Sequence, residues 1–146
     1  MGHARQRYYK GLFAIAAVYD TALGVIFLFF GRWAFEFLGI EDKYPEGGFL
    51  SLIGGFVLVL GIAYWLICAG DLERNRDLIA VGALYKLAYT GVGLYISVAE
   101  EVPHAVFFWG FGVADAVFFV LMAECWIHLA RRRRASVTGG ASAALP

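Results

Sequence analysis

Four long apolar stretches, separated by short polar segments, dominate the pattern of the chain. They cover residues 11–31, 49–69, 78–98 and 105–129. The hydrocarbon core of a bilayer, about 30 Å thick, needs about 20 apolar residues of helix. Backbone groups in lipid must also satisfy their own hydrogen bonds. We therefore predict four transmembrane helices, since the strands of a membrane barrel would alternate apolar and polar residues.

The segments between the apolar stretches have the composition of turns and loops. Residues 39–48 carry several charges and a proline, residues 71–77 read DLERNRD, and Pro103 interrupts the last connection. Such segments end helices and reverse the chain. We predict an all-α, polytopic membrane protein whose four helices form an antiparallel bundle within residues 1–134. The small and polar residues 135–146 are predicted to be a disordered tail.

Lysine and arginine gather on one side of this four-span chain. They lie before the first span, between the second and third, and after the fourth, at Arg5, Arg7, Lys10, Arg74, Arg76 and Arg131–Arg134. The other side has only Arg32 and Lys43, among several acids. Because basic loops favour the cytoplasm, both termini are predicted to be cytoplasmic. On the other side, residues 32–38 predict a short surface helix with Trp33 and Phe37 four residues apart on one face.

The composition agrees with a membrane location and excludes several other classes. Of the 146 residues, 61% are hydrophobic and 17% aromatic, while 12 basic and 12 acidic residues balance each other. This composition excludes a disordered chain and a basic nucleic-acid binder. It also excludes a disulfide scaffold, because the chain has only two cysteines. The partners predicted are the lipid bilayer and other membrane subunits or a second copy of the chain, with no nucleic acid.

The candidate site is a set of ionisable residues deep within the spans. Asp20, Lys86 and Asp115 lie near the middle of the first, third and fourth apolar stretches, and Tyr89 follows Lys86 by one helical turn. Each charge costs about 2.5–3.5 kcal/mol at the centre of a membrane helix, so each is expected to face the interior and find a partner. The cluster is either a structural set of polar contacts that fixes the helix register or a site that binds a proton or ligand.

Other chemistry is sparse along the chain. Glu124 and His128 are four residues apart on the last span, a spacing that two metal ligands on one helical face could have. Their place near the cytoplasmic end favours interfacial solvation or salt bridging instead. No catalytic set, phosphate loop or zinc motif is recognisable. We therefore predict no catalytic residue, no metal and no cofactor.

One stretch of the chain resembles a known group of proteins. The run GGFVLVLGIAYWLICAGDLERNRDLIAVGALYKLAYTGVGLY and the later run GFGVADAVFFVLMA are similar to small bacterial four-helix membrane proteins of the DoxX-like group. The shared features are the loop 71–76, the Gly82-x-x-x-Lys86 motif and the Gly112-x-x-Asp115 motif. The resemblance implies a four-helix fold in a bacterial cytoplasmic membrane. Some members of the group are linked to quinone-coupled redox systems.

Three functions follow as hypotheses. The first is a non-enzymatic accessory or scaffold subunit of a larger membrane complex, favoured by the short loops and the apolar helices. The second is a small proton-coupled transporter that uses Asp20, Lys86 and Asp115. The third is a quinone- or lipid-linked redox protein, with the aromatic face of Phe108, Phe111 and Phe118 on the last span as the wall of the binding site.

Overall fold

A computed structural model of the chain describes residues 2–99 and 104–142. Every regular element in these two ranges is helical. The long helices are α1 (His3–Phe29), α3 (Phe49–Ala69), α4 (Arg76–Ala99) and α5 (Val113–Ser142), and the short ones are α2 (Gly31–Phe37), η1 (Glu41–Lys43) and the π-helix η2 (Val106–Gly112). Four of the helical segments are long and apolar enough to cross a membrane, with η2 and α5 together forming the fourth.

The predicted spans agree with the helices in number and place, but their ends differ. The second span, 49–69, coincides with α3, while α1 already begins at His3. The short helix predicted at residues 32–38 is present as α2, in which the rings of Trp33 and Phe37 stack with centroids 5.6 Å apart; its place at a membrane surface stays a prediction. The tail is predicted to be disordered from residue 135, but residues 135–142 are helical, because α5 continues to Ser142. Residues 143–146 of the tail lie outside the described residues.

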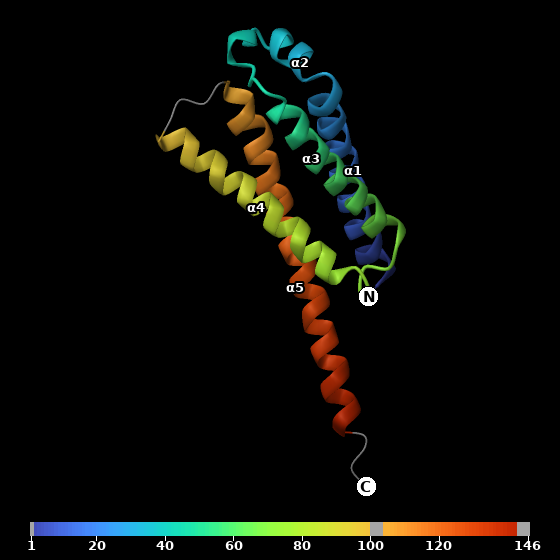
Figure 1. Cartoon of the computed structure of the whole chain (residues 1–146). Coiled ribbons are helices and arrows are strands. Elements are labelled where there is room, and N and C mark those ends of the chain that lie inside the picture. Colours follow the sequence, from blue (N-terminus) through green and yellow to red (C-terminus); the bar gives the residue numbers. More distant parts are fainter. Residues whose placement is uncertain (1, 100–103, 143–146) are drawn as a thin grey trace.

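Helices α1 and α3 pack along each other with their backbones in direct contact (Figure 1). Glycines make this approach possible: a Cβ atom on Gly54 would lie 2.5 Å from the backbone nitrogen of Leu28, and one on Gly61 would lie 2.6 Å from that of Thr21. Small residues are the usual contact surface between helices in lipid, where dispersion forces and close packing replace the hydrophobic effect. The first pair of helices is therefore specified by its glycines.

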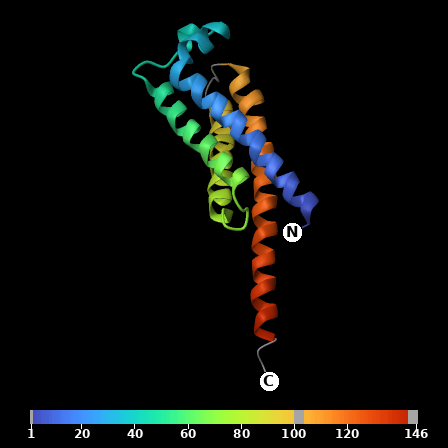
Figure 2. The same cartoon turned by 90° about the vertical axis from the view of Figure 1, so that its right-hand side faces the viewer.

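Helices α4 and α5 form a second pair that lies across the first (Figures 1 and 2). The apolar core lies where the pairs meet. Its fully buried members come from all four long helices and from the segment between α3 and α4, and include Phe13, Tyr64, Leu72, Ile79 and Met122. Beyond this core, α5 continues past the ends of the other helices as a single projecting rod (Figure 2).

The basic segments lie at one end of the molecule. The start of α1 and the segment between α3 and α4 are at this end, and α5 passes them on its way out (Figure 1). Arg132 on α5 contacts Glu73 in that segment, with 3.5 Å between Nη1 and Oε1. Arg5 on α1 lies 3.4 Å from Nδ1 of His128 on α5. The sequence segments richest in arginine therefore share one end of the fold.

Gly54→Ala tests the close packing of the first helix pair. The new methyl group would meet the backbone of α1, so we expect a loss of about 1–3 kcal/mol in unfolding free energy, the usual cost of overpacking. The matched control is Gly55→Ala, because a Cβ atom there has no atom within 4 Å. Thermal unfolding in detergent measures both. Equal stability of the two variants would contradict the packing described.

Candidate functional site

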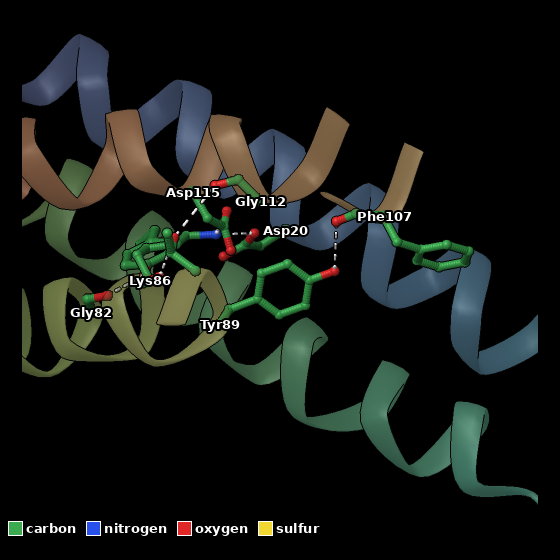
Figure 3. A network of polar contacts seen from close by, with 9 residues as sticks. Asp20, Gly82, Lys86, Tyr89, Phe107, Gly112 and Asp115 are labelled. Carbon is green, nitrogen blue, oxygen red and sulfur yellow. Dashed lines mark hydrogen bonds and ion pairs between the residues drawn. The ribbon is translucent and has the colours of Figure 1, made fainter. Parts of the chain in front are cut away.

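The ammonium group of Lys86 lies between two carboxylates (Figure 3). Lys86 Nζ donates hydrogen bonds to Oδ1 of Asp20 at 2.7 Å and to Oδ1 of Asp115 at 2.8 Å. The three residues are nearly inaccessible, with exposed fractions of 1% for Asp20 and Lys86 and 4% for Asp115. Short, charge-assisted bonds of this kind are strong because little water competes with them. We call these residues the ion triad.

The ion triad joins the two helix pairs. Asp20 comes from α1 in the first pair, whereas Lys86 and Asp115 come from α4 and α5 in the second. Direct contact between α1 and α5, and between α3 and α4, is much less extensive than contact within each pair. The bond from Lys86 to Asp20 is thus one of the few polar links between the pairs among the described residues.

Aromatic rings surround the ammonium group on its remaining sides. The ring centroids of Tyr19, Tyr85, Phe118 and Tyr64 lie 5.0, 5.4, 5.5 and 5.9 Å from Lys86 Nζ. The faces of such rings attract cations, most strongly where water is excluded. Tyr64 also donates a hydrogen bond to the carbonyl oxygen of Gly82 at 3.2 Å, which fixes α3 against α4. The site is therefore built to hold a positive charge.

A small pocket adjoins the ion triad, with both Asp20 and Asp115 among its lining residues. It has a volume of about 50 Å³ and is lined by residues of α1, α3, α4, η2 and α5. Two of its lining residues, Asp20 and Tyr19, carry buried polar atoms, Oδ2 and Oη, that have no hydrogen-bond partner among the described residues. A buried polar atom without a partner is costly and calls for an explanation such as a bound molecule.

The π-helix η2 ends three residues before Asp115 and is hydrogen-bonded to α4. Tyr89 donates a hydrogen bond to the carbonyl oxygen of Phe107 at 3.5 Å (Figure 3). Thr90 Oγ1 lies 3.4 Å from the carbonyl oxygen of Gly112 and 2.9 Å from that of Lys86. Short π-helical segments are rare and are frequent at functional sites. Here the segment sets the position from which Asp115 reaches Lys86.

Glu124 and His128, the weak metal candidates, do not converge on a metal site. Oε1 of Glu124 accepts a hydrogen bond from the Tyr9 hydroxyl at 2.9 Å, and His128 lies against the guanidinium of Arg5. No group of three or more His, Cys, Asp or Glu side chains in the described part of the chain could hold a metal ion. An adjacent cation would also oppose a metal ion at His128.

Three of the four predicted site residues meet directly. Asp20, Lys86 and Asp115 form the ion triad, whereas Tyr89 lines the pocket beside it and bonds to η2 instead. Two contributors were not predicted from the sequence, Tyr19 and Tyr64. Tyr64 could have been found, because it continues the spacing of Gly54, Val57 and Gly61 along one face of α3; these positions are all buried.

A comparison of the chain with protein-family models, with curated proteins and with solved structures finds no match. The resemblance to the DoxX-like group therefore stays a prediction.

Lys86→Met tests the energetic role of the ion triad. Removing the ammonium leaves two buried carboxyl groups without their partner, so we expect a loss of about 3–5 kcal/mol in unfolding free energy. The triple variant Asp20→Asn/Lys86→Met/Asp115→Asn carries no charge at the site and should regain most of that loss. Chemical unfolding in mixed micelles measures both variants.

Lys43→Met is the matched control for this series. The Lys43 side chain is 55% exposed, and its Nζ forms only a long ion pair with Oδ2 of Asp42, at 3.9 Å. The loss of this surface pair should change the unfolding free energy by less than about 0.5 kcal/mol. A Lys86→Met variant as stable as Lys43→Met would show that the ion triad contributes nothing to folding.

Proposed function

We propose that this chain is a small multi-pass membrane protein that binds and exchanges a proton at the ion triad, as the core of a proton-coupled carrier. The observation that carries the proposal is the charge of the buried site, in which two carboxylates face one ammonium. A net negative charge in an apolar interior is strongly unfavourable. One bound proton neutralises the site.

The position of the ion triad also supports a role in transport. Ionisable residues inside membrane spans are costly and commonly mark proton or substrate pathways. Here they lie between two helix pairs with limited direct contact, so a small shift of one pair against the other would open the site to one side. Binding or release of the proton changes the attraction between Lys86 and Asp20. That change supplies the coupling between charge and helix position.

The proposed arrangement in the membrane is an antiparallel four-helix bundle in a bacterial cytoplasmic membrane, with both termini in the cytoplasm. The support is the gathering of Arg5, Arg132 and the segment between α3 and α4 at one end of the fold. Basic residues next to membrane spans favour the cytoplasmic side.

An accessory or scaffold subunit is the second candidate function. It is supported by the apolar, exposed surface that α3 presents along its length. Phe49, Leu52, Phe56, Val59 and Leu66 are each about 60% exposed or more. Such a surface can contact lipid or the helices of another subunit.

The quinone-linked alternative has less support. Phe111 lines the small pocket, but about 50 Å³ is far below the roughly 300–1,000 Å³ of pockets that hold larger organic ligands. A quinone would need the two helix pairs to separate first.

Asp20→Asn tests the proton-exchange function. The amide keeps the shape of the side chain and can still accept a bond from Lys86, but unlike a carboxyl group it cannot gain and lose a proton near neutral pH. In liposomes with an imposed pH gradient, we expect the wild type to dissipate the gradient and the variant to lose at least tenfold in rate. The surface variant Asp42→Asn is the control and should retain the wild-type rate. Wild-type liposomes no leakier than empty ones would refute the carrier.

Extraction from native membranes in mild detergent tests the second candidate. An accessory subunit predicts co-migration with other polypeptides on gel filtration, at a mass far above that of a 16.1 kDa chain in its micelle. Phe56→Ser, on the exposed face of α3, should then weaken the association, whereas Val98→Ser near the end of α4 should not. A small particle without partners would contradict this candidate.

A further inference from the structure

We infer that the pocket beside Asp20 binds a second small cation of the ammonium class, a positively charged hydrogen-bond donor the size of water. This inference rests on the proposed function in one respect, the negative charge of the ion triad when no proton is bound. It goes further by assigning a ligand to a place in the fold that the ion triad itself does not fill.

The polar groups in the pocket suit such a ligand. Asp20 uses Oδ1 for Lys86 and leaves Oδ2 buried without a partner, and the Oη of Tyr19, which also lines the pocket, is likewise unpaired among the described residues. A carboxylate oxygen accepts hydrogen bonds, and a phenol oxygen can accept as well as donate. A molecule with several N–H donors satisfies both atoms at once, which a hydrogen-bond acceptor alone would not.

The charge of the site favours a cation over a water molecule. Lys86 is the only basic residue in the ion triad and is shared by both carboxylates. A neutral water molecule would satisfy Oδ2 of Asp20 but leave the excess negative charge in place. A monovalent cation satisfies the oxygen and neutralises the charge together.

The size and the lining of the pocket limit further which cations can bind. Its volume of about 50 Å³ exceeds the roughly 10–15 Å³ that one water-sized sphere needs. It is too small for a choline-like ion without movement of the helices. Rings of Phe27, Phe111, Tyr85 and Tyr89 also line it. Aromatic faces attract ammonium ions, and the ammonium group of Lys86 already lies over the rings of Tyr19 and Tyr85, which both line the pocket.

Ligand-dependent thermal unfolding tests this inference. Purified full-length protein in detergent is heated with ammonium, methylammonium, choline or sodium chloride at constant pH and ionic strength, and the unfolding midpoint is followed by tryptophan fluorescence. Ammonium should raise the midpoint in a saturable way, because a ligand that binds only the native state stabilises it. Methylammonium should act more weakly, and choline and sodium should have no saturable effect.

Two variants locate the binding in the pocket. Tyr19→Phe keeps the ring but removes Oη, so the apparent Kd for ammonium should rise about tenfold, as expected for one lost hydrogen bond to a charged group. Asp20→Asn should abolish the effect, and Tyr19→Phe still decides the question if that variant is too unstable to study. Tyr95→Phe is the matched control, since Tyr95 is 67% exposed on α4 and does not line the pocket, and the Kd of this variant for ammonium should equal that of the wild type.

Three results would overturn the inference: no saturable effect of ammonium, an equal effect of sodium, or an unchanged Kd in Tyr19→Phe. Each is distinguishable from failure of the proposed function. Proton flux without an ammonium effect would leave the carrier standing and refute the cation pocket. Saturable ammonium binding without proton flux would refute the carrier and support the pocket.

Discussion

One ammonium group in an apolar interior constrains most of this molecule. Lys86 Nζ holds Asp20 and Asp115 within 2.8 Å, and each of the three residues lies on a different helix. An unpaired charge in that environment is very costly, so the three helices must keep these side chains together wherever else they pack. The rotation of α1, α4 and α5 about their axes follows from this requirement. The aromatic rings around Lys86 occupy the space that the charges leave.

The rest of the fold is arranged around the ion triad as two helix pairs. Backbone contact at Gly54 and Gly61 makes the pair of α1 and α3 close and specific. The pair of α4 and α5 is held in part by side chains that reach the π-helix η2. Contact between the pairs is more limited, and the bond from Lys86 to Asp20 is one of the links that set their relative position, beside the apolar core between them. A change of charge at Asp20 or Lys86 changes an ion pair that links the two helix pairs. In the carrier that we propose, this change would couple proton binding to the relative position of the pairs.

The sequence predicts the helices and the ion triad well, and for physical reasons. Spans of about 20 apolar residues have no other stable form in lipid, and buried Asp and Lys residues must find each other. Three features were not accessible in this way. No residue composition distinguishes a π-helix from an α-helix. This one depends on hydroxyl groups of α4 that bond to its carbonyl oxygens. The place of Tyr19 depends on the rotation of α1. The pocket is formed by residues of several helices, so no local sequence pattern predicts it.

The most direct test of the account is magic-angle-spinning NMR of the protein in lipid bilayers. With ¹⁵N in the lysine side chains and ¹³C in the aspartate carboxyl groups, the Lys86 ammonium should show strong dipolar coupling to two carboxyl carbons, those of Asp20 and Asp115. Asp20→Asn, in which the new amide carbon is unlabelled, should reduce this to a coupling with Asp115 alone. A Lys86 ammonium signal with no coupling to any aspartate carboxyl carbon would contradict the ion triad and, with it, the function proposed for this site.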